Sequence, residues 1–397
     1  MDLITKIKSF FNPPERRVLV LAFCIYLPFI FLGYGSDYDS YNVLWAGKYF
    51  VHTLDYVPSR VPGFFVFEAL TYIFNSIGGS LLTNFASLCM SLLILHHFMQ
   101  LCREHAVPHY PLLAVILMLQ PYYLVNSTCT MDYLFAFGFV FWGLMVIRKG
   151  NYLAAGLLMA LGIGSRLTSA LPAGIFLAWA FLSQPEKRGK VILSGLVTLV
   201  LAFLFYLPPL DFAEWQMHIF SPSVGTEVFW APILRLGRFV YKTVYFWSPF
   251  VFAILVWGMI RLISSRLKWN KPEFNGLPLT AAAVILGMQA FYLRLPTEPS
   301  YLIPTIPFWL ILMGIAFADR RRVLAVMLAL VILSNFLVVN IARPDQVNQA
   351  TGAQYGLWVE PGHLVRDVQT RLEYIGCGYQ PCSYLEDPPH QQATPIP

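Results

Sequence analysis

The chain has 397 residues, of which 57% are hydrophobic and 12% charged, and its mean hydropathy is +0.60. Soluble proteins have about 25% charged residues, so this composition excludes an ordinary soluble domain. The net charge is +6, but the basic residues recur in short links between apolar runs and form no stripe. Membrane topology explains that pattern better than a nucleic-acid partner does. The composition therefore predicts an all-α polytopic membrane protein that does not bind nucleic acid.

Apolar runs of about 17–22 residues recur along the chain, long enough for helices to cross a hydrocarbon layer about 30 Å thick. The first run follows Arg16 and Arg17 and lacks a small-residue cleavage site, which indicates a retained helix. We expect about eleven transmembrane helices. Their predicted positions are 18–34, 80–101, 110–126, 131–147, 151–165, 168–183, 190–209, 241–261, 277–293, 301–318 and 323–340.

Basic residues gather in every second link, for example Arg148-Lys149 and the run Arg320 to Arg322. This bias predicts a cytoplasmic N-terminus, and an odd number of crossings then places the C-terminus on the exoplasmic side. The chain divides into a transmembrane domain, 1–343, and a short exoplasmic tail, 344–397, in a bacterial inner membrane or an ER-type membrane. In that oxidising compartment we expect Cys377 and Cys382 to pair, with two free thiols as the alternative.

The first exoplasmic loop, 35–79, is far more polar than its surroundings. Two segments within it, Ser40 to Thr53 and Pro62 to Ile77, mix aromatic and polar residues and predict amphipathic helices at the membrane surface. The second segment could instead be a short span. That alternative would turn Arg148, Lys149 and the Arg320 run outward, against the charge bias.

Two acids, Asp37 and Asp39, follow the first helix directly. A carboxylate at this depth is partly desolvated, which raises its pKa toward working pH and suits a general base. The alternative is an N-cap for the helix that starts at Ser40. Both roles can coexist, with one acid capping and the other catalytic.

Three arginines, Arg60, Arg166 and Arg294, are predicted at the outer ends of hydrophobic segments, where positive charge is not expected. Guanidinium groups bind phosphate well, and a lipid phosphate would lie at that depth. The alternatives are snorkelling toward water or pairing with a nearby acid, such as Glu298 for Arg294. Glu298 itself is either a site residue or an ordinary loop acid.

The sequence gives weaker indications of a function for the pair Glu214 and His218 and for Asp132. In the loop Asp211 to Val240, Glu214 and His218 are one helical turn apart, which indicates a solvated face or a sugar or acceptor contact. Asp132 begins the predicted 131–147 helix, where capping is the default role and a polar contact inside the bundle is the alternative.

Several motifs resemble the GT-C superfamily of membrane glycosyltransferases, especially protein O-mannosyltransferases and lipid A aminoarabinose transferases. Asp37-Tyr38-Asp39-Ser40-Tyr41 keeps the D-x-x-x-Y spacing of the family's first loop and is followed by Trp45-Ala46. Ala154 to Gly174 is similar to a Gly-Leu-Ala…Lys…Leu-x-Pro pattern, with Arg166 at the Lys position. Glu298 to Phe308 is similar to the late Arg-Tyr-x-x-Pro-x-x-Pro stretch, although Ser300 replaces its Arg.

The resemblance implies a polyprenyl- or dolichyl-phosphate-linked sugar as donor and an inverting transfer to an acceptor hydroxyl at the exoplasmic face. Asp37, with Asp39 as second candidate, would be the base, and Arg60, Arg166 and Arg294 would hold the donor phosphate. The remaining candidates, for sugar, lipid or acceptor contacts, are Tyr41, Trp45, Tyr301, Glu298 and His218. No cofactor or metal site is predicted, and a divalent cation is neither required nor excluded.

A hexosyl or pentosyl transferase is therefore the leading hypothesis. The alternative is a transporter or flippase for a lipid-linked or anionic solute, in which the same arginines would line a pathway. Transporters usually contain internal repeats with paired broken helices, and no such repeat is visible in the sequence. A scaffold without chemistry would leave the acidic loop unexplained.

Overall fold

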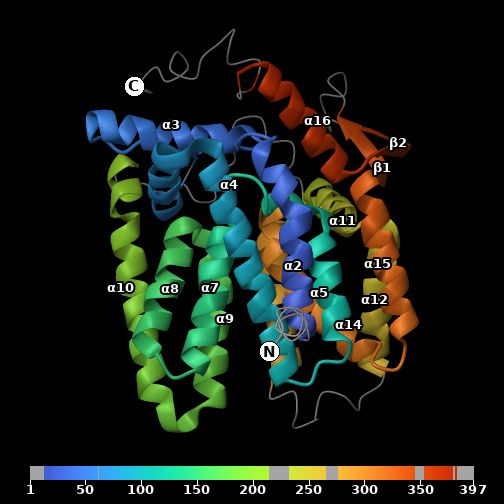
Figure 1. Ribbon diagram of the computed structural model, residues 1–397. Helices are drawn as coiled ribbons and strands as arrows, with labels where there is room; N and C mark the ends of the chain where they lie inside the picture. Colours follow the sequence, from blue (N-terminus) through green and yellow to red (C-terminus); the bar gives the residue numbers. More distant parts are fainter. Residues whose placement is uncertain are drawn as a thin grey trace, which may run out of the picture.

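The computed structural model describes residues 13–60, 62–213, 232–264, 276–344, 353–378 and 381. It is a helical bundle covered at one end, the upper end in Figure 1, by two helices and a two-stranded sheet. The α-helices of the described residues are α2 (Pro14–Tyr26), α3 (Tyr38–Thr53), α4 (Phe65–Glu104), α5 (Tyr110–Leu119), α6 (Pro121–Asn126), α7 (Asp132–Arg148), α8 (Tyr152–Ser165), α9 (Ala170–Ser183), α10 (Arg188–Phe212), α11 (Pro232–Trp247), α12 (Pro249–Ser264), α13 (Leu277–Arg294), α14 (Ile306–Ala316), α15 (Arg321–Phe336) and α16 (His363–Gly376). Short 3-10 helices are η1 (Leu27–Phe31), η2 (Leu167–Ser169), η3 (Pro185–Lys187) and η6 (Pro299–Thr305), and the strands are β1 (Leu337–Pro344) and β2 (Ala353–Pro361).

Helix α7 lies at the centre of one half of the bundle and is buried on nearly all sides. A helix that is apolar all round needs such an environment. Glycines let its neighbour α8 come close: a Cβ on Gly162 would lie 2.5 Å from Cγ2 of Val140 in α7, and one on Gly156 would lie 2.7 Å from the carbonyl oxygen of Ser194 in α10. Small residues bring membrane helices together in this way. The result is a tightly packed α7–α8–α10 unit.

Most predicted spans coincide with helices, but several of these helices are broken. The segment predicted as one span over 241–261 consists of α11 and α12, which meet at Ser248 with a bend of 99°. The span predicted over 110–126 is divided into α5 and α6 at Gln120, which caps α6 before Pro121. By length and composition, four helical segments among the described residues are able to cross a membrane, or five if the bent pair counts as one span. Shorter apolar helices, including α5 and α8, make up much of the rest.

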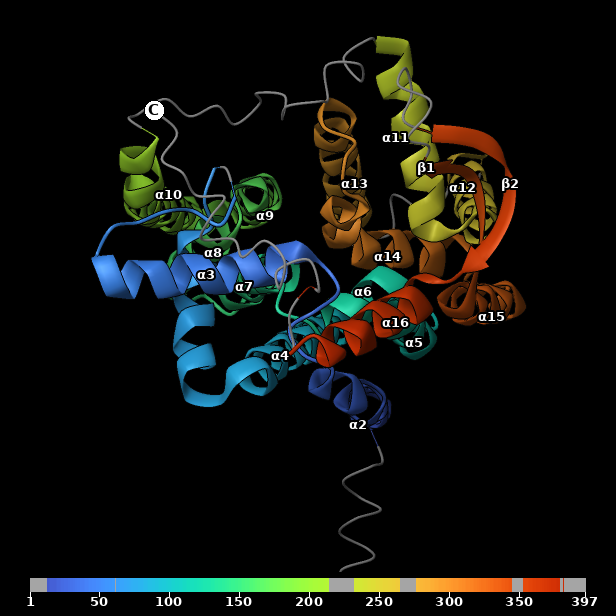
Figure 2. The same ribbon diagram turned by 90° about the horizontal axis from the view of Figure 1, so that it is seen from above.

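The segment predicted to contain two surface helices folds into α3 and the first part of α4. Helix α3 lies across the upper end of the bundle, over α7 and α8 (Figures 1 and 2). Helix α4 is interrupted at Gly78 and Gly79, whose backbone is not helical, so residues 65–77 turn away from the long descending part. The polar loop thus has two helical pieces near the predicted boundaries.

The C-terminal part contains structure that the sequence analysis did not predict. Strand β1 follows α15 directly and pairs antiparallel with β2, from Leu337 opposite Pro361 to Pro344 opposite Ala353. The pairing is irregular between Asn340 and Ala342. Asn340 joins the sheet to the bundle, since it donates to Glu360 at 2.9 Å and accepts from the Tyr241 hydroxyl at 2.8 Å.

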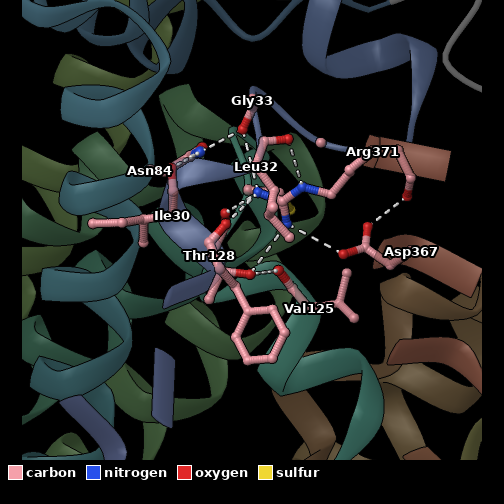
Figure 3. A network of polar contacts seen from close by, with 12 residues as sticks. Ile30, Leu32, Gly33, Asn84, Val125, Thr128, Asp367 and Arg371 are labelled. Carbon is pink, nitrogen blue, oxygen red and sulfur yellow. Dashed lines mark hydrogen bonds and ion pairs between the residues drawn. The ribbon is translucent and has the colours of Figure 1, made fainter. Parts of the chain in front are cut away.

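Helix α16 is attached to the end of η1 through a fully buried arginine (Figure 3). The last carbonyl groups of a helix lack partners within the helix. Here Arg371 donates to the carbonyl oxygens of Phe29, Leu32 and Gly33, at 2.8, 3.2 and 3.2 Å, and to that of Thr128 at 2.8 Å. Its charge is paired with Asp367 at 3.2 Å. We call this set of contacts the Arg371 latch, and it holds the turn that leads to Asp37.

Candidate active site

Asp132 is the centre of a charged cluster at the upper end of the bundle. It is the first residue of α7, and its carboxylate is fully buried. One oxygen accepts from Arg60 at 2.9 Å, and the other accepts from Arg166, the C-cap residue that follows α8. Met131 is the N-cap residue and no side chain caps the helix. The default prediction of a capping role for Asp132 is therefore wrong, and the contact inside the bundle is what the structure shows.

Arg60 connects this buried pair to the α3 helix. Its second terminal nitrogen donates to Asp39 at 2.5 Å, so the guanidinium joins two carboxylates. Charges removed from water are tolerated only when they are paired, and two acids here balance two arginines. The Nε atoms of Arg60 and Arg166 are buried and have no hydrogen-bond partner among the residues that the structure describes. The Nε–H of each guanidinium is thus a donor that a further oxygen ligand could use.

The loop that carries Arg60 is held by a buried acid on α4. Glu68 accepts from the backbone amide and the hydroxyl of Ser59, at 2.8 and 2.6 Å, and from the hydroxyl of Tyr56 at 2.5 Å. These bonds satisfy a carboxylate that would otherwise be costly to bury. Glu68 therefore fixes the loop immediately before Arg60.

Aromatic rings surround the two guanidinium groups. Arg166 lies over Tyr133, 4.0 Å from the ring centroid, and over Tyr301 of η6, 4.6 Å from the centroid. Arg60 lies 4.6 Å from the ring centroid of Phe64. Cation–π contacts of this kind are worth more when water is excluded. The rings fix the arginines in an environment where their electrostatic effect is strong.

Asp37 is the N-cap residue of α3, where its Oδ1 accepts from the Asp39 amide at 2.9 Å. Of the two acids, Asp37 is therefore the one that caps the helix, which is the alternative role predicted from the sequence. The residue is exposed to solvent on one side, and protein atoms surround its carboxyl group on the other sides. This desolvation, assisted by the neighbouring Asp39 charge, raises the pKa of Asp37 to about 6. A carboxyl with a pKa near neutral is able to exchange protons at working pH.

Asp39 differs from Asp37 in having a cationic partner. Burial raises its pKa, while the charge of Arg60 acts in the opposite direction. Because Asp39 is engaged by Arg60, its carboxylate is less available to a substrate than that of Asp37. The geometry therefore favours the same order of the two acids as the motif spacing does.

Glu298 begins η6 and accepts from the amide and hydroxyl of Ser300, at 3.1 and 2.9 Å. Its charge also acts on Asp37 and on Lys242 of α11. It is thus a capping residue that contributes to the electrostatic field of the site. Tyr301, three residues further on, reaches the Asp132 cluster through its contact with Arg166.

An apolar groove of about 450 Å³ runs between α8, α9 and α10 and begins next to Arg166. Its lining includes Leu167, Leu177, Leu199 and Phe203. Arg166 is not itself a lining residue, but Tyr206 of the lining is close enough to Arg166 for the guanidinium charge to act on it. A molecule with a hydrocarbon chain and an anionic head would match this combination.

The other predicted site residues lie apart from the Asp132 cluster or outside the described residues. Arg294 ends α13 with an exposed side chain and is not one of the arginines paired with Asp132. Tyr41 is buried against Tyr34 and Tyr374, and Trp45 packs on Tyr49. His218 lies outside the described residues, as does Cys382, while Cys377 is disulfide-bonded.

Among the residues that the structure describes, no group of three or more His, Cys, Asp or Glu side chains has the arrangement of a metal site. The charged network instead combines carboxylates with guanidinium groups.

The fold and the cluster define a polytopic helical membrane protein with a charged site at one end of its bundle. ArnT, an aminoarabinose transferase of the GT-C superfamily, has this fold. The crystal structure of ArnT from Cupriavidus metallidurans bound to undecaprenyl phosphate matches with a TM-score of 0.54 and 17% identity, over 80% of this chain and 62% of that chain. The apo structure gives a TM-score of 0.52 and 18% identity, over 76% and 59%.

This chain thus spans about three fifths of the length of the ArnT structures. No protein-family model matches the sequence, and no match was found among proteins of curated function. At this identity the likeness shows the fold alone, and the fold agrees with the predicted resemblance to the aminoarabinose transferases.

Proposed function

We propose that this protein is a membrane glycosyltransferase that takes a hexose or pentose from a polyprenyl-phosphate-linked donor. The observation that carries the proposal is the convergence of Arg60 and Arg166 on buried Asp132, each with a buried Nε that has no partner among the described residues. Guanidinium donors of this kind suit a phosphate. The adjacent groove of about 450 Å³ would take part of the prenyl chain. The undecaprenyl phosphate bound in one ArnT structure supports this ligand class.

In the proposed reaction, Asp37 removes the proton from an acceptor hydroxyl. The acceptor oxygen attacks the anomeric carbon while the bond from that carbon to the phosphate oxygen breaks, so the configuration inverts. The lipid phosphate leaves with the electron pair, and Arg60 and Arg166 stabilise its charge. Preorganised cations in a site that excludes water are effective because they need little reorganisation during the reaction.

The proposal places the site at the exoplasmic face, with the N-terminus in the cytoplasm. Supporting it, the start of α2 and the helix α16 lie at opposite ends of the bundle (Figure 1). The basic sequence Arg320 to Arg322 at the start of α15 and Arg148 at the end of α7 belong to the lower end, away from Asp37. Positive charge marks the cytoplasmic side.

The test uses the full chain in proteoliposomes with radiolabelled undecaprenyl-phosphate sugars, hexosyl and pentosyl, and a membrane lipid extract as acceptor. We expect release of undecaprenyl phosphate together with transfer of label, and loss of both in Arg166→Ala. Movement of the donor across the bilayer without release would support the transporter alternative. Binding of undecaprenyl phosphate that is equal in wild type and Arg166→Ala would refute the phosphate site.

A further inference from the structure

A second cavity lies at the lower end of the bundle, far from Asp37. It has a volume of about 850 Å³ and lies where α9 ends and α13 begins, next to the end of α7. Its walls include four apolar side chains and two cations: Leu144, Ile175, Leu182, Leu279, Arg148 and Lys187. Among the part of the lining that the structure describes there is no carboxylate. Neither the Asp132 cluster nor the groove beside Arg166 shares any of these residues.

The two kinds of lining residue are segregated. Ile175 and Ala283 belong to the bodies of α9 and α13, whereas Arg148 is the last residue of α7 and Lys187 the last residue of η3. The apolar part of the cavity therefore follows the helices, and the cationic part lies at their ends. A long amphiphile with an anionic head group is divided in a matching way, into an apolar chain and a charged end.

Arg148 is held in a fixed position at the polar part. It donates to Glu104 at 2.9 Å, and its guanidinium lies 5.2 Å from the ring centroid of Trp179. Its Nε is buried and lacks a hydrogen-bond partner among the described residues. A guanidinium that is already oriented loses little freedom when it binds an oxygen ligand.

At the rim, Leu182 is 70% exposed and Leu279 is 67% exposed. A soluble phosphate would use the cations and leave these leucines uncovered, whereas an acyl chain would cover them. Exposed apolar residues next to cations favour a lipid over a soluble anion.

We propose that this cavity binds an anionic phospholipid of the leaflet opposite the active site. The phosphate lies against Arg148 and Lys187, and one acyl chain lies along Leu144, Ile175 and Leu279. The proposal does not depend on the glycosyl transfer proposed above, because no residue of the two sites is shared.

The experiment uses the full chain, delipidated in detergent and titrated with phosphatidylglycerol, with phosphatidylcholine of the same acyl chains, or with inorganic phosphate. Native mass spectrometry measures bound lipid and thermal unfolding measures stabilisation. We expect phosphatidylglycerol to bind at least several-fold more tightly than phosphatidylcholine and to raise the Tm, and inorganic phosphate to do neither.

Two variants locate the binding. Lys187→Gln removes an exposed cation, and since one basic residue contributes about 1 kcal/mol to anionic-lipid binding, affinity for phosphatidylglycerol should fall about fivefold. Ala283→Phe fills the apolar part of the cavity, which Ala283 lines, and should reduce the binding of both lipids. Lys190→Gln, on α10 and outside the lining, is the matched control and should bind as wild type does.

Equal binding of the two lipids, or unchanged phosphatidylglycerol affinity in both Lys187→Gln and Ala283→Phe, would mean ordinary surrounding lipid only and would overturn the proposal. Inorganic phosphate that stabilises the protein and loses this effect in Lys187→Gln would identify a soluble anion as the occupant, which also overturns it.

Discussion

The carboxylate of Asp132 accepts a hydrogen bond from Arg60 at 2.9 Å, although the two residues are 72 positions apart and belong to different parts of the fold. This bond joins the polar first loop to the centre of the bundle. Because Asp132 also holds Arg166, one buried carboxylate sets the positions of both arginines that we assign to the donor phosphate.

Asp132→Asn should destabilise the protein severely. The amide keeps the shape of the side chain but leaves two buried guanidinium groups without their shared counter-charge, and breaking a buried pair costs about 3–5 kcal/mol. Thermal unfolding in detergent measures this loss. Asp55→Asn, at an exposed position between α3 and α4, is the control and should unfold as wild type does. An unchanged Tm in Asp132→Asn would contradict the predicted role.

Asp37→Asn separates catalysis from helix capping. Asparagine is as good an N-cap as aspartate, so the start of α3 should be preserved while the base is lost. We expect kcat to fall about 100-fold or more with an unchanged Tm. Asp37→Ala should lose the same activity and in addition about 1 kcal/mol of stability. If Asp37→Asn stays fully active while Asp39→Asn does not, the base is Asp39.

The pH dependence of kcat/KM should reflect the raised pKa of Asp37. A general base must be deprotonated, so a group with a pKa of about 6 loses activity as the pH falls through 6. We expect a tenfold fall per pH unit below that point and a plateau above it. A profile that stays flat down to pH 4.5 would contradict the assignment.

Glu298→Gln should move this acidic limb to lower pH. The Glu298 charge contributes to the raised pKa of Asp37, and glutamine removes that charge while its side-chain oxygen can still accept from Ser300. The pKa of Asp37, and with it the midpoint of the profile, should therefore fall. Glu186→Gln, an exposed acid in η3, should leave the midpoint in place.

The Arg371 latch should be necessary for activity although it lies outside the proposed chemistry. Arg371→Lys keeps a charge for Asp367 but cannot supply donors to all four carbonyl groups. We expect a lower Tm and a lower kcat, because the turn before Asp37 loses its support. Leu372→Ala changes an exposed residue of the same helix and should alter neither value.

Hydropathy predicted the positions of most helices because a membrane span is a property of a continuous segment. It could not predict the break at Ser248, since apolar residues continue on both sides of it. The β1 strand was missed for a similar reason. Leu337 to Ile341 continues the apolar run of α15, and only its β-branched residues indicated a strand.

The site was predicted unevenly for a physical reason. Asp37 and Asp39 lie at the start of one helix, so they could be proposed from their spacing in the sequence, although the pairing of Asp39 with Arg60 could not. Asp132 acts by bringing together Arg60 and Arg166 from segments far apart in the chain, and its sequence context is that of an ordinary helix start. The sequence did offer one indication of how the Arg60 loop is held. Glu68 is an acid inside an apolar segment, and such a buried acid needs hydrogen-bond donors nearby.

The Arg371 latch also constrains the order in which the protein can be completed during synthesis. The carbonyl oxygen of Leu32 accepts from Arg371, which lies 339 residues later in the chain. Contacts of such separation form late, because the intervening chain must first be arranged. The turn before Asp37 can therefore become fully ordered only after α16 has been synthesised and has reached the same side of the membrane. During synthesis, the helices and strands from α2 to β2 are therefore made before the contacts of Arg371 that support Asp37 can form.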